Sequence, residues 1–392
     1  MCIRDSYKPG RHFLQIPGPT NVPESVIRAM SQPVVDHRGP AFPKLTKGII
    51  EKLKPVFKTN SAIFIFPSSG TGGWECALLN VLSPGDKVLA FETGHFATLW
   101  RKVAENLGLN VLWMPGDWRH GIDPSLLEEK LREDGKHEIK AILAVHNETS
   151  TGVTSQIRKL REAIDSAKHP ALFMVDTVSS LACSEFKHDE WGVDVTVTAS
   201  QKGLMLPPGL SFNAASEKAL KISKSTKAQH SYWRWDAMLE DNARGYFPYT
   251  PGTNLLYGLD EALNLLHAEG IDNVIARHAR LAEATRIAVS TWGLENLCLN
   301  PAEYSNSLTA VMVPEGSDAD ALRKTILERF NMSLGTGLGK LQGLVFRIGH
   351  LGDYNELMLA GTLSGVEMGL ALADIPHHRG GVSAAMKFLS TQ

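Results

Sequence analysis

Lys202 is the residue of this sequence that is best placed for covalent chemistry. It lies in the run TASQKG at 198–203, at the end of the apolar, β-branched stretch 193–200, whose composition predicts a buried strand. Ligands of open α/β sheets bind beyond the carboxyl ends of strands, and a lysine amine at such an end can form an imine with an aldehyde. The alternative is a solvated surface lysine, which is the usual environment of this residue type.

A glycine-rich run, PSSGTGGWE at 67–75, predicts a binding site for an anion. It follows a predicted strand at 62–66 and opens a predicted helix at 71–82, so that free backbone N–H groups and the positive end of the helix would converge on a phosphate. The run is not a GxGxxG motif, because Glu75 stands in place of the third glycine, and it lacks the GK[ST] of a P-loop. A plain strand-to-helix connection is the alternative.

Two charged residues lie in apolar surroundings that require a partner. Asp176 ends the apolar run ALFMV, where a carboxylate needs a cation, although capping a helix or forming a structural ion pair would also account for it. Arg347 lies inside the apolar run VFRIG, where a guanidinium commonly binds a carboxylate through two hydrogen bonds. That carboxylate could belong to a substrate or to an internal acidic residue.

The elements that must position these residues follow a βαβ order. Short apolar runs that predict buried strands alternate with longer amphipathic runs that predict helices. The predicted strands span 62–66, 87–91, 110–114, 139–145, 171–176 and 193–200, and the predicted helices span 71–82, 95–107, 123–134 and 155–168. This order predicts an α/β fold with a mostly parallel sheet that is covered by helices on both faces.

The last third of the chain predicts a second, smaller α+β domain. A long helical stretch near 255–292 precedes strand-like runs at 305–313 and 344–349 and a helical run at 318–330. We therefore expect an N-terminal arm at 1–14, a large domain at 15–269 and a small domain at 270–392. The opening hexapeptide MCIRDS, residues 1–6, differs in character from the chain that follows, and we treat it as a candidate non-native segment.

Composition and charge exclude several classes of function. The 392 residues include 40 Lys and Arg against 42 Asp and Glu, and the formal charge of -2 offers no field for nucleic acid or an acidic membrane. No apolar run reaches the roughly 18 to 20 residues of a membrane helix, and no signal peptide is evident. The four cysteines are scattered and the histidines show no HExxH-like spacing, so we expect no metal site and a reducing, cytoplasmic location.

The phosphate cradle, the imine-forming lysine, the strand-end aspartate and the buried arginine together match the needs of pyridoxal phosphate. With these residues in place, the sequence resembles the class V aminotransferases of fold type I, most closely the serine–glyoxylate and alanine–glyoxylate aminotransferases. The likeness extends from about Ile16 to Val382 through PGPTNVPESVIRAM, SSGTGGWE, SPGDKV, VHNETSTGV, HPALFMVD, DEWGVDV, SQKG, PPGL, PYTP, ARHARL and VFRIGHLG. It implies pyridoxal phosphate as the cofactor, a large domain with a mostly parallel seven-stranded sheet, a smaller C-terminal α+β domain, and a homodimer.

The resemblance also implies roles for individual residues around the cofactor. Lys202 would hold the cofactor as an imine, and Asp176 would pair with its ring nitrogen. The residues that would contact the ring, its phenolic oxygen or its phosphate are Phe96, Val178, Thr149, Ser69, Gly70, Thr71 and Gln201. Thr250, together with Tyr249, would reach the phosphate from a neighbouring subunit.

Substrates implied by the resemblance are a small amino acid and a 2-oxo acid. Arg347 would grip the α-carboxylate of the substrate, while Pro19, His37 and Arg38 would line the substrate entrance near the dimer interface. The leading hypothesis is transfer of the amino group of L-serine to glyoxylate, which gives hydroxypyruvate and glycine. Arg38 could instead receive a second carboxylate, so L-aspartate is the nearest alternative donor, followed by alanine and ureidoglycine.

Two alternatives belong to other functional classes. A lyase or desulfurase that uses the same cofactor would need a mobile catalytic cysteine, whereas Cys298 lies in the apolar context LCL and Cys183 closely follows the strand that ends at Asp176. Neither cysteine lies on a flexible loop rich in glycine and serine. A non-catalytic binding protein would leave Lys202 on the surface.

Overall fold

The computed structural model describes residues 10–391, and a seven-stranded sheet forms the centre of the larger part of the chain. Its strands are β2 (Ala62–Phe66), β3 (Lys87–Phe91), β4 (Asn110–Met114), β5 (Ile139–Val145), β8 (Leu172–Asp176), β9 (Val195–Ala199) and β10 (Ser211–Ala215). They lie in the order β2-β10-β9-β8-β5-β3-β4, and only β10 runs antiparallel to its neighbours. The predicted α/β fold with a mostly parallel sheet is confirmed.

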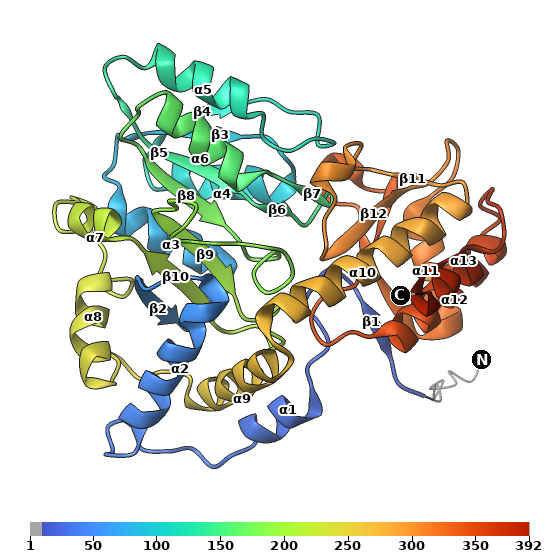
Figure 1. Ribbon diagram of the computed structural model, residues 1–392, viewed down its shortest axis with the longest axis horizontal. Helices are drawn as coiled ribbons and strands as arrows, with labels where there is room; N and C mark the ends of the chain where they lie inside the picture. The colour runs from blue at the N-terminus through green and yellow to red at the C-terminus, as the bar shows by residue number, and fades with distance from the viewer. Residues whose placement is uncertain (1–9, 392) are drawn as a thin grey trace, which may run out of the picture.

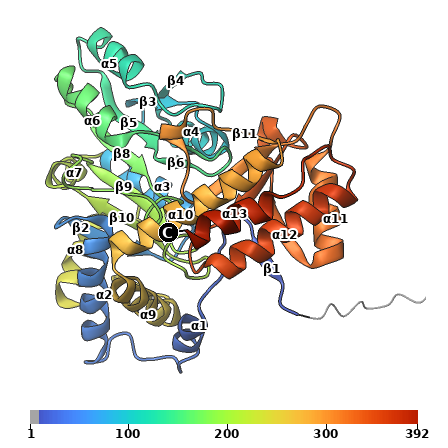
Figure 2. The ribbon, with the colours of Figure 1, turned by 45° about the vertical axis from the view of Figure 1, so that its right-hand side comes forward.

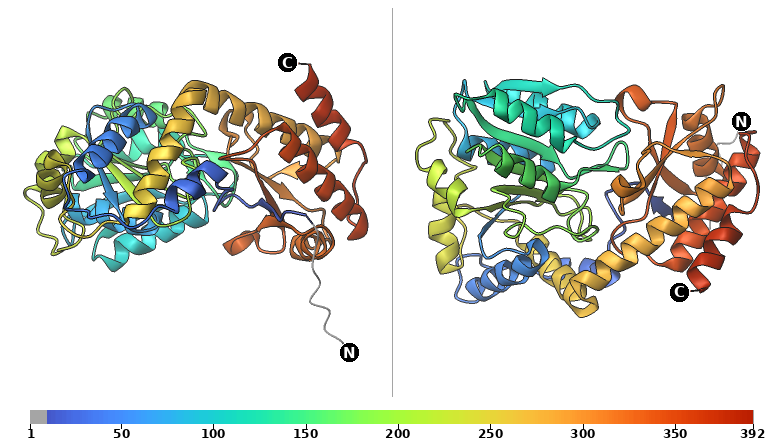
Figure 3. Two further views of the ribbon diagram at one scale, coloured as in Figure 1. Left: turned by 90° about the horizontal axis from the view of Figure 1, so that it is seen from below. Right: turned by 45° about the horizontal axis from the view of Figure 1, so that its top comes forward.

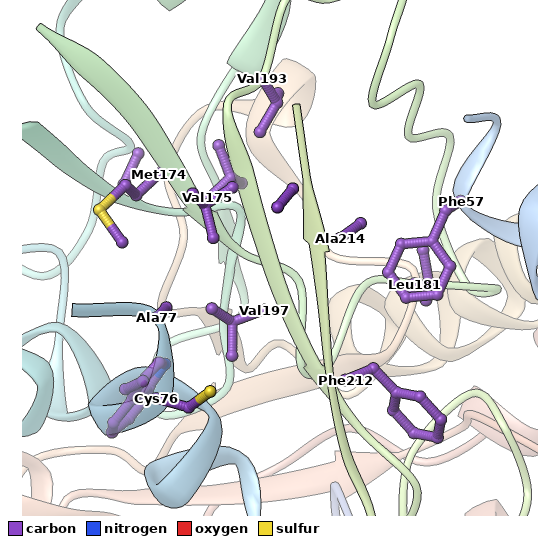
Figure 4. Close-up of a cluster of buried hydrophobic side chains, with 14 of the residues drawn as sticks. Phe57, Cys76, Ala77, Met174, Val175, Leu181, Val193, Val197, Phe212 and Ala214 are labelled. Carbon is purple, nitrogen blue, oxygen red and sulfur yellow. The ribbon is translucent and has the colours of Figure 1, made fainter. Parts of the chain in front are cut away.

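Helices cover both faces of this sheet. They are α1 (Glu24–Met30), α2 (Phe42–Phe57), α3 (Gly70–Val81), α4 (His95–Asn106), α5 (Pro124–Glu133), α6 (Ile157–Ser166), α7 (Glu217–Ser223), α8 (Trp235–Arg244) and α9 (Thr253–Glu269). Every residue of β8, β9 and β10 is buried, as expected for strands with helices on both sides. Figure 4 shows this core, in which Val175 and Met174 of β8 lie near Val197 of β9 and Ala77 of α3.

One predicted strand differs from the expectation. The run 110–114 forms β4, but β4 is the edge of the sheet and its residues are half-buried or exposed rather than buried. The sequence NVLWM gives the same apolar pattern as an interior strand, although only its place at the sheet edge decides how much of it solvent reaches. Arg101 of α4 lies over the ring of Trp113 at 5.1 Å and covers part of this edge.

A second sheet of five strands forms the core of the smaller part. Its strands are β1 (Phe13–Gln15), β11 (Glu295–Asn296), β12 (Leu308–Met312), β13 (Met332–Thr336) and β14 (Val345–Gly349), in the order β1-β13-β14-β12-β11. Its helices are α10 (Ile271–Thr291), α11 (Ala319–Phe330), α12 (Glu356–Leu372) and α13 (Gly381–Ser390), which pack side by side in Figure 2. The short elements are β6 (Asn147–Glu148), β7 (Val153–Thr154) and 3₁₀ turns at Pro301–Glu303 and Gly339–Leu341.

The helical stretch predicted at 255–292 is two helices rather than one. Gly270, with φ +87°, ends α9 and precedes α10, and glycine adopts this left-handed conformation without the strain of a Cβ. Figure 3 shows α10 running from the large sheet to the small one. We propose Gly270 as the boundary between the two domains. The strand β1, near the N-terminus, belongs to the smaller part, because it pairs with β13 of the small sheet.

Two expectations concern the N-terminal arm and membrane-spanning helices. Residues 1–9 lie outside the described residues, and so do most of the predicted arm at 1–14 and the whole of the candidate non-native segment 1–6. Among the helices of residues 10–391, none combines the length and the apolar character needed to cross a membrane.

Candidate active site

A cavity of about 250 Å³ lies at the carboxyl ends of β8 and β9 and brings together most of the predicted site residues. Ten of them line it, namely Pro19, Ser69, Gly70, Thr71, Phe96, Thr149, Asp176, Val178, Gln201 and Lys202. Four further residues that the sequence did not single out also line it, namely Gly18, Trp74, Asn147 and Pro208. The carboxyl ends of parallel strands meet at one edge of the sheet, which is why positions far apart in the sequence converge here.

Lys202 follows β9 and is buried, with 7% of its surface exposed, so the surface alternative is wrong. Its amine donates a hydrogen bond to the carbonyl oxygen of Pro17. Burial, with a smaller contribution from the positive charge of Arg347, lowers the pKa of the lysine to about 7. A substantial fraction of the amine is therefore neutral near pH 7, which is the form that attacks an aldehyde.

Gly18 leaves the space that the side chain of Lys202 occupies. A Cβ at Gly18 would lie 2.4 Å from Cδ of Lys202, and the φ of Gly18 is +94°. The left-handed backbone conformation favours glycine at this position, and a Cβ here would displace the amine end of Lys202. The segment PGPT is thus fitted to the lysine, an arrangement that its sequence pattern alone did not reveal.

Asp176 ends β8 and is 4% exposed. Its Oδ1 accepts a hydrogen bond of 2.6 Å from the backbone N–H of Val178, and its Oδ2 accepts one of 2.9 Å from the indole N–H of Trp74. Burial raises the pKa of this carboxyl to about 7, against the lowering effect of both donors. Among the described residues Asp176 caps no helix and forms no ion pair, so neither structural alternative accounts for it.

The glycine-rich run lies at the start of α3, where it presents free backbone amides to the cavity. Ser69 precedes the helix without a side-chain capping bond, and the first helical bond runs from Gly73 N–H to the carbonyl oxygen of Ser69. The amides before Gly73 therefore lack helical acceptors and can bind an anion together with the positive helix end. A Cβ at Gly70 would lie 2.9 Å from Val178, so glycine lets the start of α3 approach the loop that follows β8 and Asp176.

Thr149 lines the cavity, but its hydroxyl hydrogen is already donated to another residue. It donates a 2.7 Å hydrogen bond to Oγ of Ser179, which also accepts a 2.8 Å bond from the side-chain amide of Asn147. Ser179 in turn donates to the backbone carbonyl of Asn147. The Thr149 oxygen can therefore act as an acceptor toward the cavity, while Asn147 keeps a second N–H.

Arg347 lies on β14, behind Thr149, and its side chain is buried. Its Nη1 donates to the carbonyl oxygen of Thr149 at 2.6 Å, and its Nε donates to the carbonyl oxygen of Thr336 at 2.7 Å. Burial lowers the pKa of the guanidinium to about 10, which leaves it charged at neutral pH. Within residues 10–391 it forms no direct ion pair, although the nearby carboxyl of Glu148 favours its charged form. A guanidinium has five N–H donors, so N–H groups remain beyond the two bonds to backbone carbonyls.

Like Arg347, the other predicted residues do not line this cavity. Tyr249 stacks on Tyr232 with ring centroids 4.3 Å apart, and the hydroxyl of Thr250 lies 3.4 Å from Nε2 of His37. Thr250 and Arg38 are exposed. The single chain thus brings His37 and Thr250 together, and it does not bring them to the cavity that Lys202 lines.

Glu148 is a buried carboxylate beside the cavity that the sequence analysis missed. It is 1% exposed, and its oxygens accept bonds from Ala97 N–H at 3.0 Å, Phe96 N–H at 3.3 Å and the hydroxyl of Ser150 at 2.7 Å. It therefore caps the start of α4 from a different element, which stabilises a helix N-terminus. Because Phe96 belongs to that first turn, Glu148 fixes the aromatic wall of the cavity.

Glu148→Gln is expected to destabilise the protein by about 2 kcal/mol, because an amide nitrogen would replace one acceptor among N–H and O–H donors. Urea unfolding measures this change. The control is Glu105→Gln, which removes an exposed ion pair with Arg101 and is expected to change stability by less than about 0.5 kcal/mol. Equal effects of the two substitutions would contradict the capping role.

Comparison with known proteins identifies the family. The model of the aminotransferase class-V family matches residues 12–343. The chain is 50% identical over 386 residues to serine--glyoxylate aminotransferase of Arabidopsis thaliana, covering 98% of this chain and 96% of the relative.

Two further relatives show the same relationship. L-aspartate--glyoxylate aminotransferase of Paracoccus denitrificans is 45% identical over 374 residues, with 95% of this chain and 94% of the relative covered. The crystal structure of ureidoglycine-glyoxylate aminotransferase from Bacillus subtilis superposes with a TM-score of 0.88 at 28% identity, covering 99% of this chain and 100% of the other. The chain that carries Lys202, Asp176 and the phosphate cradle belongs to the class V aminotransferase family.

Proposed function

We propose that this protein is an aminotransferase that moves the amino group of L-serine to glyoxylate and so forms hydroxypyruvate and glycine. The observation that carries the proposal is the burial of Lys202 and Asp176 in one cavity with the anion cradle of α3. Identity over nearly the whole length to a serine--glyoxylate aminotransferase supports this choice of substrates. L-aspartate is the second candidate donor, supported by the 45% identical relative.

Pyridoxal phosphate is the cofactor of the class V aminotransferases, and the cavity residues fit it. The amides at the start of α3 suit its phosphate, Lys202 suits its aldehyde and Asp176 suits a protonated ring nitrogen. The buried side-chain oxygen of Gln201 has no hydrogen-bond partner within residues 10–391. Buried polar atoms are normally hydrogen-bonded, which supports a ligand in this cavity. When bound, this cofactor supplies an aldehyde and an electron-withdrawing ring.

Three residues of this chain supply substrate binding, proton transfer and charge stabilisation. Arg347 holds the α-carboxylate of the amino acid by two parallel hydrogen bonds. Nζ of Lys202, with its pKa near 7, accepts the proton that leaves the α-carbon and releases it again as a general acid. Asp176 supplies the negative charge that favours a protonated ring nitrogen. Such positioning of reacting groups contributes several kcal/mol to lowering the barrier.

Arg347→Lys is expected to raise KM for both the amino acid and glyoxylate by about 10-fold to 100-fold, because an ammonium cannot make two parallel bonds to a carboxylate. Steady-state kinetics with each substrate varied measures this. Arg323→Lys is the control, since Arg323 already bonds Asp320 and the carbonyl oxygen of Leu334. If KM stayed unchanged for both substrates, the carboxylate would bind elsewhere.

The proposed assembly is a homodimer that completes the site from a neighbouring subunit. Thr250 and Tyr249 would reach the phosphate of the neighbour, and His37 and Arg38 would lie near the substrate entrance; their position outside the cavity of their own chain supports this. Sedimentation should give twice the chain mass, and a fully active monomer would contradict the assignment of Thr250. We also propose the reducing cytoplasm as the location, because Cys76, Cys183 and Cys298 are free.

Donor preference is tested by measuring kcat/KM for L-serine, L-aspartate and L-alanine with glyoxylate as the acceptor. Serine is expected to give the largest value. If aspartate exceeded serine tenfold, the second candidate would replace the first. Release of sulfide from cysteine would instead favour a desulfurase, which the burial of Cys183 and Cys298 disfavours, because a catalytic cysteine of that kind must be accessible.

A further inference from the structure

Trp74 has an indole N–H that points at a carboxylate of the site. It lies in the second turn of α3, lines the cavity and is 3% exposed. Its Nε1 donates a 2.9 Å hydrogen bond to Oδ2 of Asp176, 102 positions further along the chain. The proposed function described above assigns no task to this side chain.

The two oxygens of Asp176 each have one fixed donor. Oδ2 receives the indole N–H of Trp74, while Oδ1 receives the backbone N–H of Val178 at 2.6 Å. An ionised carboxylate offers about four acceptor positions, so two of them remain for a ligand in the cavity. Two donors from different elements, a helix and the loop after β8, set the orientation of the carboxylate.

Tight packing holds Trp74 in this position. A Cβ at Gly73 would lie 2.9 Å from Val197 of β9, so glycine lets α3 approach the sheet closely. On its other side the Trp74 ring stacks on Trp100 of α4, with centroids 5.9 Å apart and planes 14° from parallel. Trp100 is itself 1% exposed. A side chain confined in this way keeps its hydrogen bond without losing further rotamer entropy.

The charged groups around Asp176 do little to stabilise its ionised form, so the two hydrogen-bond donors matter for its charge state. Glu148 on β6 is a second buried carboxylate that disfavours ionisation of Asp176, and Lys202 after β9 acts weakly in the opposite direction. Both hydrogen bonds that the Asp176 carboxylate accepts within residues 10–391 come from neutral donors. Hydrogen bonds to a buried carboxylate favour its charged form, and the indole N–H supplies one of the two such bonds found in the described part of the chain.

We propose that Trp74 is a positioning residue for the ring nitrogen of the cofactor, acting through Asp176, which its indole N–H holds charged and oriented toward the cavity. This inference rests on the proposed function only for the identity of the cofactor. The same helix supplies the phosphate cradle and Trp74, so one rigid element sets the distance between the phosphate site and the carboxylate that meets the ring.

The test compares Trp74→Phe with the wild type in binding two cofactors to the full chain after removal of its cofactor. One is pyridoxal phosphate, and the other is its 1-deaza analogue, in which a C–H replaces the ring nitrogen. Loss of one hydrogen bond to a charged group is expected to weaken pyridoxal phosphate binding about tenfold. Binding of the analogue, which gives Asp176 no nitrogen to meet, is expected to change less than about twofold.

Trp100→Phe is the matched control. Its indole nitrogen has no hydrogen-bond partner among the described residues, so the substitution removes an indole N–H from the same stack without breaking a bond, and neither affinity should change. Equal weakening of both cofactors by Trp74→Phe would show a purely structural role and overturn the proposal, as would unchanged affinity for pyridoxal phosphate. No amino donor enters this experiment, so an error in the choice of serine would leave its outcome unaffected.

A measurement on the wild-type side chain keeps the proposal testable if Trp74→Phe folds poorly. With ¹⁵N-labelled tryptophan, the indole N–H resonance that moves in Asp176→Asn identifies Trp74. This resonance is expected to shift when pyridoxal phosphate is added and to shift much less with the 1-deaza analogue, because only the ring nitrogen changes the charge that the carboxylate meets. Equal shifts with both cofactors would contradict the proposal.

Discussion

Lys202→Ala is expected to lower kcat for transamination about 10⁴-fold, because one buried amine provides both the covalent attachment of the cofactor and the proton transfer. The cavity itself should survive, since the phosphate cradle and Asp176 belong to other elements. Single-turnover kinetics with L-serine measures the loss, and the absorbance spectrum should lack the band of the imine with lysine.

Lys202→Arg keeps a positive charge at this position but removes the amine that attacks the aldehyde and transfers the proton. A guanidinium stays protonated and neither attacks an aldehyde nor carries a proton between carbon atoms, so this variant should be as inactive as Lys202→Ala. Lys218→Ala serves as the control lysine, because Lys218 pairs with Asp194 and does not line the cavity; it should keep wild-type kcat. Turnover by either Lys202 variant within tenfold of the wild type would remove Lys202 from the mechanism.

The fold could be predicted because the interior strands are self-evident in the sequence. The run ALFMVD is apolar throughout, since helices cover both faces of β8, and the same holds for the strand before Lys202. The edge strand β4 carries a similar apolar run, and its half-exposed state follows from strand order, which the composition of a run does not specify. The domain boundary expected at 269/270 coincides with the break between α9 and α10, although the helical stretch across it was expected to be continuous.

The site residues with their own sequence pattern were predicted, and those defined by tertiary contacts were missed. Lys202 and the glycine-rich run stand out by type and position after a strand. Trp74 belongs to the same run, but its partner Asp176 is 102 positions away, and an aromatic residue in a helix usually indicates core packing. Glu148 is similar, because it caps α4 from a separate element. The residues beside it in the sequence, HNETST at 146–151, are polar, so nothing in the sequence marked this glutamate as buried.

Two of the proposed cofactor contacts come from one helix. The amides at the start of α3 and the indole of Trp74 both belong to this helix, and Gly70 and Gly73 let it lie close to Val178 and Val197. A shift of α3 would therefore disturb the phosphate site and the carboxylate at the ring nitrogen at the same time. Rigid elements of this kind hold reacting groups more accurately than loops do.

Asp176→Asn is expected to lower kcat/KM about 10³-fold, because a neutral amide cannot stabilise the positive charge on the ring nitrogen. Steady-state kinetics with L-serine and glyoxylate measures this loss. The control is Thr177→Val, next to Asp176, which removes a hydroxyl that donates to the carbonyl oxygen of Val197 and leaves the carboxylate in place. A variant that kept more than a tenth of the wild-type kcat/KM would contradict the role of Asp176.

The same substitution should change how stability depends on pH. Because the pKa of Asp176 rises from its ordinary 3.8 to about 7 in the folded chain, the folded state keeps a proton that the unfolded state releases. The stability advantage of the protonated carboxyl is therefore complete below about pH 4 and is lost as the pH rises toward 7, at up to about 1.4 kcal/mol per pH unit. Urea unfolding of the cofactor-free chain between pH 4.5 and 6.5 tests this through the difference in unfolding free energy between the wild type and Asp176→Asn, which should fall with rising pH at this slope. Burial lowers the pKa of His146, His188, His278 and His350, and the resulting rise of stability with pH is common to both proteins and cancels in the difference. Parallel stability curves for the two proteins would contradict this prediction, because they would mean that the carboxyl of Asp176 has the same pKa in the folded and the unfolded chain.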